Sequence, residues 1–280
     1  MDPIRIVSWN MAYRKQPWRE LAAMDADVAL LQETCRPPAD LPPNVEPETG
    51  DLWTPWEQRD YDRWPMVVKL SDRVKIERFS RIRPFSYVGP REMAVSGIGT
   101  VAIARVTPVG GQPFVAVSMY ARWITPQASV KTTWKVGMPD MAAHRIISDM
   151  AMFIGHEDPS THRILAAGDL NMCYGTDDVP SRSLLARERT VWDRMRALGL
   201  EFMGPQYPAG RKAVLVPGAS DTRNVVTYHT TKQTPETAKI QLDYAFASHG
   251  FHESIIVRAM NGVAEWGSSD HCRLLIEISE

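Results

Sequence analysis

Residues 163–171 read RILAAGDLN, a short apolar run that ends in a polar turn. An apolar stretch of this length, followed by a glycine and polar residues, is typical of a buried β-strand. Asp169 and Asn171 therefore follow the end of a strand. A polar residue there either forms a turn or faces a site at the rim of a sheet, and one strand alone does not distinguish the two.

Four other segments combine a strand pattern with polar residues at or near its end. Asn10 follows IRIVSW at 4–9, Gln32-Glu33 ends the run that begins at Val28, Asp243 lies within QLDYAF at 241–246, and Asp270-His271 precedes CRLLIEI at 272–278. Each cluster alone is an ordinary turn signal. Together, the five clusters predict that polar side chains from separate strands meet at one rim of a sheet.

The donor atoms in these clusters are mainly carboxylate and amide oxygens. The sequence has no CxxC and no spacing of His and Cys that is typical of a zinc site. Oxygen ligands suit Mg²⁺ or Mn²⁺, and Mg²⁺ commonly takes one or two carboxylates together with water and substrate phosphate. We therefore expect Mg²⁺ or Mn²⁺ as the cofactor.

The overall composition is that of an ordinary globular chain. Of the 280 residues, 44% are hydrophobic and 23% are charged, which excludes disorder, collagen and coiled coil as descriptions of the whole chain. The 32 basic and 33 acidic residues give a formal net charge of −1. This charge excludes a strongly basic, histone-like binder but not an enzyme that holds nucleic acid through a local patch.

The cysteines and the N-terminus bear on the compartment. Cys35, Cys173 and Cys272 are expected to be free thiols in a reducing compartment. The N-terminal stretch MDPIRIVSWN lacks the pattern of a signal peptide, and no stretch approaches about 18 uninterrupted apolar residues. We therefore expect a cytoplasmic protein without a membrane segment.

Strand and helix patterns alternate along the chain and predict an α/β (α+β) fold. Helices are predicted over 17–24, 139–155 and 181–198, a hairpin over 101–106 and 114–120, and closing strands over 225–230, 241–248, 254–260 and 272–278. Residues 1–280 show no linker or internal repeat and are predicted to form one domain. The proline-rich stretch 36–66, which carries three tryptophans, predicts a long surface excursion.

The five clusters, taken in order, resemble the motifs of the endonuclease/exonuclease/phosphatase superfamily. The motifs are WN at 9–10, QE at 32–33, GDLN at 168–171, LDY at 242–244 and SDH at 269–271, with SGIGTVAIA at 96–104 and the SMY that ends at Tyr120 as further matches. They span residues 6–272. The resemblance implies a DNase I-like fold, a four-layer sandwich of two packed mixed β-sheets flanked by helices.

The resemblance implies a metal site. Glu33 would be the principal metal carboxylate, Asn10 would lie beside it as a neutral oxygen ligand or water anchor, and Asp270 would contribute from the far strand. The ion would neutralise a non-bridging phosphate oxygen and help the leaving oxygen to depart.

It also implies a catalytic set around the phosphate. Asp169 would position or deprotonate the attacking water, and Asn171 would hydrogen-bond the scissile phosphate. His271 would contact the phosphate or act as a general acid–base, with Asp243 fixing its tautomer. Tyr120 matches the tyrosine of the family's tyrosine-bearing strand. Water would attack in line, without a covalent intermediate.

The chain departs from the exonuclease III pattern after Tyr120. Those members follow the tyrosine with a proline and then an asparagine that reaches the phosphate, whereas this chain has Arg122 and Trp123 at the two positions. Arg122 either supplies the phosphate contact through its bidentate fork or is a surface arginine in a loop. The departure bears on abasic-site specificity more than on phosphoester cleavage.

Basic and aromatic residues interleave in the long segment before the LDY motif, which suits a nucleic-acid backbone and base stacking. Arg223, Asn224 and Tyr228, together with Arg122 and Trp123, are expected to bind substrate. For each residue of the segment, a place in a solvated loop is the alternative.

These observations favour a divalent-metal-dependent phosphodiesterase that hydrolyses nucleic acid, with DNA preferred. The first alternative is a phosphoesterase of the same fold that acts on phospholipid head groups, inositol phosphates or small nucleotides, because a fold does not determine its substrate. The second is a nucleic-acid-binding module that has lost turnover. The oligomeric state is not predicted.

Overall fold

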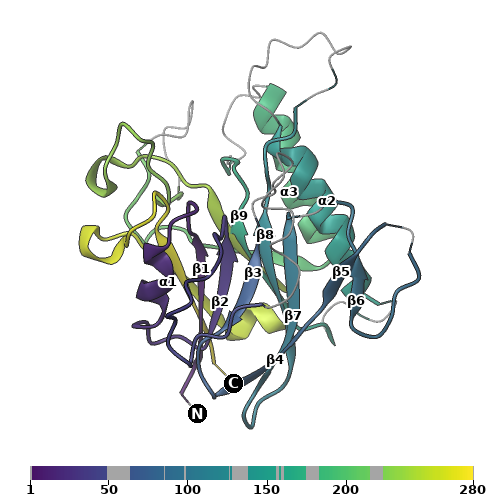
Figure 1. Ribbon diagram of the computed structural model, residues 1–280. Helices are drawn as coiled ribbons and strands as arrows, with labels where there is room; N and C mark the ends of the chain where they lie inside the picture. Colours follow the sequence, from purple (N-terminus) through teal and green to yellow (C-terminus); the bar gives the residue numbers. More distant parts are fainter. Residues whose placement is uncertain are drawn as a thin grey trace.

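Two mixed β-sheets packed face to face occupy the centre of the protein (Figure 1). The computed structural model describes residues 2–48, 64–84, 86–97, 99–125, 127, 138–155, 158, 161–174, 183–214 and 223–279. The first sheet has the order β12 (Ile255–Met260), β13 (Arg273–Ile278), β1 (Ile4–Asn10), β2 (Val28–Gln32), β3 (Met66–Lys69). The second has the order β10 (Leu200–Gly204), β11 (Asp243–Ser248), β9 (Ile164–Asp169), β8 (Phe114–Tyr120), β7 (Val101–Pro108), β4 (Val74–Arg78).

Three apolar layers hold the sandwich together. Between the sheets, Ile6, Leu30 and Ile276 of the first sheet belong to one buried cluster with Ala116, Leu165 and Ala245 of the second. Helices α2 (Pro139–Met150) and α3 (Ser183–Ala197) cover the outer face of the second sheet, and α1 (Gln16–Leu21) covers the outer face of the first. The expected α/β four-layer sandwich is therefore confirmed.

The strand registers bring the polar strand ends together. Strands β8 and β9 are parallel, with Tyr120 opposite Asp169, and β11 runs antiparallel to β9, with Asp243 opposite Asp169. In the first sheet, parallel β1 and β2 place Asn10 opposite Gln32. The side chains singled out in the sequence thus end up at the same end of two neighbouring sheets.

The segment 225–230 does not form the predicted closing strand. Tyr228 instead makes isolated bridges to Ile240 and to His271. The segment lies between two stretches of backbone, the residues that precede β11 on one side and those that precede β13 on the other. On the second side the Thr227 carbonyl accepts the Cys272 N–H. A backbone that divides its hydrogen bonds between two partners in this way cannot continue as a regular ladder with either.

Other elements differ from the prediction in their ends or their existence. Helix α1 ends at Leu21 and α2 at Met150, where the 3-10 turn η2 (Ala151–Phe153) follows. Strands β3, β4 and β10 and the small parallel pair β5 (Ser80–Ile82) and β6 (Glu92–Ala94) are not among the predicted elements. Among the described residues, no helix is long and apolar enough to cross a bilayer.

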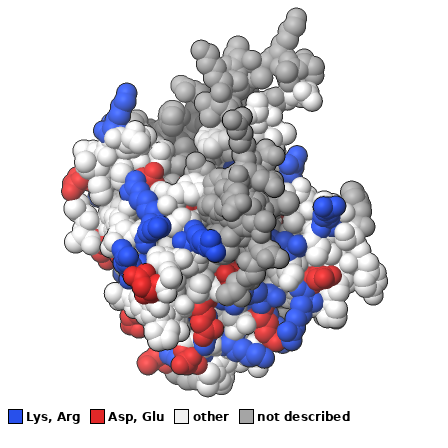
Figure 2. All heavy atoms as spheres, viewed as in Figure 1, with Lys and Arg blue, Asp and Glu red and all other residues white. Residues whose placement is uncertain are grey.

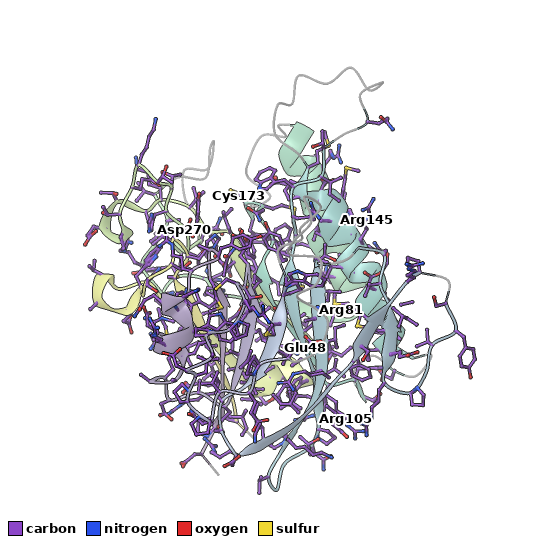
Figure 3. The ribbon with its side chains drawn as sticks, viewed as in Figure 1. Glu48, Arg81, Arg105, Arg145, Cys173 and Asp270 are labelled. Atoms are coloured by element: carbon purple, nitrogen blue, oxygen red, sulfur yellow. The ribbon has the colours of Figure 1, made fainter. Side chains whose placement is uncertain are left out.

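Both ends of the predicted excursion 36–66 contact the body of the protein, while residues 49–63 lie outside the described residues. Trp64 is buried, and the Arg81 guanidinium lies 5.4 Å from the centroid of its ring. The same guanidinium is 3.4 Å from the Glu48 carboxylate (Figure 3). Arg81 also donates to the Pro65 and Val101 carbonyls. These contacts connect the described residues on both sides of 49–63 to β5 and β7.

Candidate active site

A cavity of about 740 Å³ opens where the polar strand ends meet. Its walls come from segments that are far apart in the sequence, as Cys173 and Asp270 illustrate in Figure 3. The residues that line it are Glu33, Tyr120, Arg122, Trp123, Asn171, Cys173, Glu188, Tyr228, Ile240, Leu242, Asp270 and His271.

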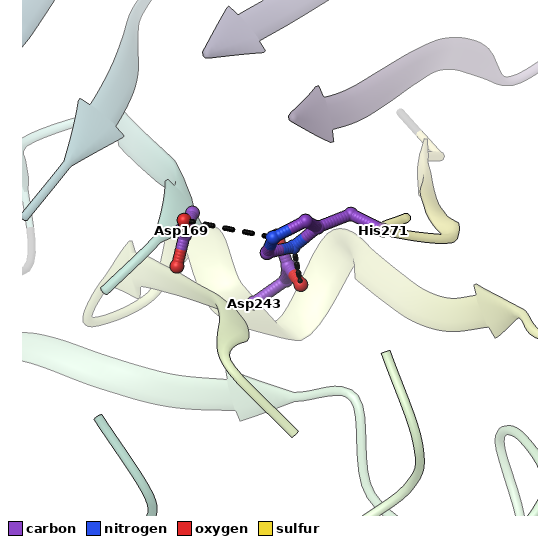
Figure 4. Close-up of side chains that lie close together, drawn as sticks. All are labelled: Asp169, Asp243 and His271. Atoms are coloured by element: carbon purple, nitrogen blue, oxygen red, sulfur yellow. Dashed lines mark hydrogen bonds and ion pairs between the residues drawn. The ribbon is translucent and has the colours of Figure 1, made fainter. Parts of the chain in front are cut away.

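His271 lies between two buried carboxylates (Figure 4). Its Nδ1 donates to Asp243 Oδ2 at 2.9 Å, and its Nε2 is 3.9 Å from Asp169 Oδ2. Burial lowers the pKa of His271, but the carboxylates of Asp243 and Asp169 outweigh it and raise the value to about 10. The imidazole is therefore positively charged at neutral pH, and the hydrogen bond to Asp243 fixes the direction of the ring.

Asp169 is fully buried and accepts three hydrogen bonds from two asparagines. Its Oδ2 accepts from Asn10 Nδ2 at 2.9 Å and from Asn171 Nδ2 at 3.0 Å, and its Oδ1 accepts from the Asn171 backbone N–H at 2.7 Å. Burial raises the pKa of Asp169 to about 7, against the opposing effect of the positive charge on His271. Near neutrality this carboxyl group is therefore able to accept or release a proton.

The backbone at two residues of the site takes a conformation that residues other than glycine usually avoid. Glu33 and Asn171 have φ values of 47° and 52°, in the left-handed region. Such positions cost free energy and occur preferentially at functional sites. At Gly168 a Cβ atom would lie 1.9 Å from the Met119 carbonyl oxygen, so only glycine allows β9 to approach β8 this closely.

A hydrogen-bonded turn attaches the SDH motif to the end of β1. Ser269 Oγ donates to the Asn10 carbonyl at 2.6 Å and accepts the His271 N–H at 3.2 Å. The Trp9 indole donates to the His271 carbonyl at 3.0 Å. The backbone positions of Asp270 and His271 therefore depend on the first sheet, although Asp169 and Asp243 belong to the second.

The structure brings most of the predicted site residues to the cavity. Glu33, Tyr120, Arg122, Trp123, Asn171, Tyr228, Asp270 and His271 line it, and Asn10, Asp169 and Asp243 are fully or almost fully buried next to these residues. Tyr228 packs on His271, with 4.8 Å between ring centroids. Burial, and then the carboxylates of Asp270 and Asp169, raise the pKa of Tyr228.

Two predicted substrate-binding residues do not line the cavity. Asn224 is buried, and its Nδ2 donates to the Tyr174 carbonyl at 2.8 Å. Arg223 is exposed, and one of its Nη atoms donates to the Tyr207 carbonyl at 3.4 Å. Asn224 supports the backbone beside the cavity, so any contact that it makes with substrate would require this arrangement to change.

Several residues at the site were not predicted to have a role there. Glu188 and Cys173 line the cavity, and burial raises their pKa values to about 7 and about 11, so Cys173 remains a thiol at neutral pH. Ser269 and Gln32 belong to the SDH and QE motifs, but no role was predicted for either. Gln32 Nε2 donates to Ser118 Oγ at 2.9 Å and so joins the two sheets. Nothing in the local sequence distinguishes Glu188 from the solvent-facing charges of a helix.

Comparison with known proteins supports the fold assignment. A scan against protein-family models finds no match, and neither does a search of the curated proteins. Among solved structures, the endonuclease domain of TRAS1, a telomere-specific non-LTR retrotransposon, is 15% identical, with a TM-score of 0.60 over 99% of this chain and 98% of that one.

Two further solved structures cover this chain almost completely. The AP endonuclease LMAP from Leishmania major is 15% identical, with a TM-score of 0.63 over 100% of this chain and 88% of that one. A variant of the 3' phosphatase NExo from Neisseria, bound to a product DNA hairpin, is 14% identical, with a TM-score of 0.55 over 99% of this chain and 100% of that one. The resemblance inferred from the motifs is thus confirmed for the fold, which is DNase I-like.

Proposed function

We propose that the protein is a divalent-metal-dependent phosphodiesterase that hydrolyses nucleic acid, with DNA as the preferred substrate. The structural neighbours include an endonuclease domain, an AP endonuclease and a 3' phosphatase bound to DNA. The observation that carries the proposal is the cavity itself. It combines a charged imidazole with carboxylates, an amide, two tyrosines and an arginine around a space large enough for a nucleotide.

Two sets of side chains are candidates for holding a metal ion. Asp169, Asp243 and His271 offer ligand atoms within 4.8 Å of one another. However, His271 Nδ1 donates to Asp243, and the Asp169 oxygens accept three N–H groups, so these atoms already have partners within the protein. The carboxylates of Glu33 and Asp270, which line the cavity, are the better fit, since Mg²⁺ takes one or two carboxylates plus waters.

Asn10 is a weaker candidate ligand for the same metal site, because both of its side-chain polar atoms already have partners in the protein. It is fully buried, its Oδ1 accepts the Ala12 N–H at 2.9 Å, and its Nδ2 donates to Asp169. A second lone pair on Oδ1 remains for a metal ion or a water molecule. Mg²⁺ or Mn²⁺ bound here would neutralise charge on the phosphate and on the leaving oxygen.

The residues of the chain itself have distinct tasks. The His271 imidazolium and Arg122 would bind phosphate oxygens and stabilise the negative charge that grows during attack. Asp169, with a pKa of about 7, would accept the proton of the attacking water. Asp243 would keep the His271 ring charged and correctly oriented. Tyr120 and Tyr228 would contribute hydroxyl groups to the cavity, and Trp123 would offer an aromatic surface on which a base can stack.

The surface charge favours local recognition of nucleic acid. On the face shown in Figure 2, Lys and Arg side chains are interspersed with acidic and neutral ones among the coloured residues. The net charge of −1 agrees with this mixed pattern. Binding would therefore depend on the groups at the cavity and on the metal ion more than on a broad electrostatic field.

The proposal is tested by incubating purified protein with end-labelled duplex DNA, single-stranded RNA, phospholipid vesicles, inositol phosphates and nucleoside phosphates. Each substrate is combined with Mg²⁺, Mn²⁺ or EDTA. We expect cleavage of DNA that requires the metal ion and stops in EDTA. The lengths and end groups of the products identify the bond attacked.

Two outcomes would overturn the proposal. Release of phosphate from lipids, inositol phosphates or free nucleotides, with DNA intact, would indicate a different phosphoesterase. Binding of DNA without cleavage in any metal would indicate a module without turnover.

A further inference from the structure

Trp123 makes a polar contact that its place in the cavity wall does not require. The side chain is 45% exposed and lines the cavity, yet its indole Nε1 is 3.2 Å from Asn171 Oδ1. Asn171 in turn contacts Asp169 through both its backbone and its side chain. A chain of direct hydrogen bonds therefore runs from the exposed tryptophan to the buried carboxylate.

The indole N–H acts on the orientation of the Asn171 amide from the side of the amide oxygen. An amide can be turned by 180° at little steric cost, and many neighbours would accept either orientation. An indole N–H is a donor only, so it must face Oδ1 and never Nδ2. Trp123 therefore favours the orientation in which Oδ1 faces the indole and Nδ2 faces Asp169 and the Ala121 carbonyl.

In this orientation both Nδ2 hydrogens of Asn171 are used within the protein. One is donated to Asp169 Oδ2 at 3.0 Å and the other to the Ala121 carbonyl at 3.3 Å. The reversed amide would instead turn its oxygen toward the Asp169 carboxylate, an unfavourable pair of acceptors. The resemblance implied that Asn171 binds the scissile phosphate, but here its side-chain donors are directed to Asp169 and the Ala121 backbone.

We propose that Trp123 is a positioning residue, whose indole N–H orients the Asn171 amide so that Asn171 holds the Asp169 carboxylate in place. The inference rests on the proposed function in assigning a catalytic task to Asp169. It gives Trp123 two separable features. The N–H acts through Asn171 on turnover, whereas the exposed ring face is available to substrate and acts on binding.

The hydrogen bond is tested first without any measurement of activity. The ¹H–¹⁵N spectrum of the protein contains indole N–H signals from nine tryptophans, and the signal lost in Trp123→Phe identifies Trp123. We expect this N–H to exchange slowly with solvent despite the exposure of the ring. In Asn171→Ala the signal should move upfield and exchange at least about 10-fold faster, since the acceptor is gone.

Asn44→Ala is the matched control, because Asn44 also donates to a backbone carbonyl but lies outside the cavity lining. It should leave the Trp123 signal unchanged. A Trp123 N–H that exchanges at the rate of a free indole, or that is unaffected by Asn171→Ala, would overturn the proposal whether or not the protein hydrolyses DNA.

The positioning role is tested by a double-mutant cycle on DNA cleavage. Trp123→Phe keeps an aromatic face but removes the N–H, so kcat should fall about 10-fold while KM changes less than about twofold. In the Asn171→Ala background, Trp123→Phe should have no further effect on kcat. Trp123→Ala should raise KM in both backgrounds, because it also removes the ring.

The possible results separate the hypotheses. Equal losses of kcat from Trp123→Phe with and without Asn171 would show that the tryptophan does not act through the asparagine. A wild-type protein without turnover on any substrate would contradict the proposed function, and the exchange measurement would still decide whether the indole orients the amide. Thermal unfolding of each variant confirms that the comparison is made between folded proteins.

Discussion

Asp169 has an environment of hydrogen-bond donors that suits a carboxylate and suits an amide poorly. Both of its oxygens accept N–H groups, from Asn10 and Asn171, and His271 lies 3.9 Å away. In Asp169→Asn one of these oxygens becomes an NH₂ group that faces a donor. The substitution also removes the charge that helps to keep His271 protonated.

We therefore expect Asp169→Asn to lower kcat by at least about 10²-fold, the scale of losing one well-placed electrostatic group. It should also destabilise the protein by about 1–3 kcal/mol, the cost of a buried donor without an acceptor. Steady-state kinetics and thermal unfolding measure the two effects. Asp193→Asn, on the exposed side of α3, is the control and should change neither. Wild-type turnover in Asp169→Asn would remove Asp169 from the mechanism.

Glu33 is the residue at which metal binding is most directly tested. Its side chain lines the cavity, and its backbone holds the strained φ of 47°. Glu33→Gln preserves the shape and removes the charge, so Mn²⁺ affinity, measured by calorimetry, should fall at least about 10-fold. The Mn²⁺ concentration for half-maximal cleavage should rise in parallel. An unchanged binding isotherm would show that Glu33 is not a ligand.

At the scale of single elements, α3 carries a buried acid into the cavity wall. Glu188 is 5% exposed, and burial raises its pKa from 4.5 to about 7. In the unfolded chain this group ionises near its ordinary value. The folded state therefore binds the proton more tightly, so the stability that protonated Glu188 provides is complete below about pH 4.5 and is lost as the pH rises through about 7.

Glu188→Gln removes this dependence, because a glutamine does not ionise. Between pH 5 and pH 8 the wild type should lose stability that the variant keeps. The stability of the variant relative to the wild type should therefore be greater at pH 8 than at pH 5, by at most roughly 3 kcal/mol or several degrees in Tm. Calorimetric scans of both proteins at the two pH values measure the difference. Asp193→Asn on the same helix should show no such change. A Tm difference between Glu188→Gln and wild type that is the same at both pH values would contradict the raised pKa.

Also at this scale, the local sequence predicted some elements and missed others. Strands such as β1, β9 and β13 are short apolar runs with clear ends, and the sequence located them within a few residues. Segment 225–230 has the same β-branched and aromatic composition but lacks a regular partner strand. Strand formation depends on a neighbouring strand, and composition alone does not reveal whether one is present.

At the scale of the whole molecule, the site exists because two sheets end at the same place. The turn that carries Asp270 and His271 is attached to β1 of the first sheet through Ser269. Asp169 and Asp243, from adjacent strands of the second sheet, complete the surroundings of His271. Packing between the sheets, through the buried cluster that Leu30 and Leu165 share, therefore determines the geometry of the site.

The sequence by itself determined which functional groups are available and, through its motifs, which fold brings them together. The polar residues at strand ends and their oxygen donors predicted one polar rim with a metal site, because strand periodicity and turn signals are local properties of the chain. The order of the motifs resembles that of the endonuclease/exonuclease/phosphatase superfamily, and this resemblance implied the DNase I-like sandwich. Most of the side chains singled out for the site, including Glu33 and His271, lie in or directly beside one cavity.

Only the tertiary structure decided how those side chains are paired. It buried Asn224 beneath the Tyr174 backbone, placed Glu188 of a charged helix in the cavity wall, and oriented the Asn171 amide through Trp123. Each of these outcomes depends on the direction of a side chain relative to a segment far away in the sequence. Such directions arise when layers pack together, and no local pattern of residues encodes them.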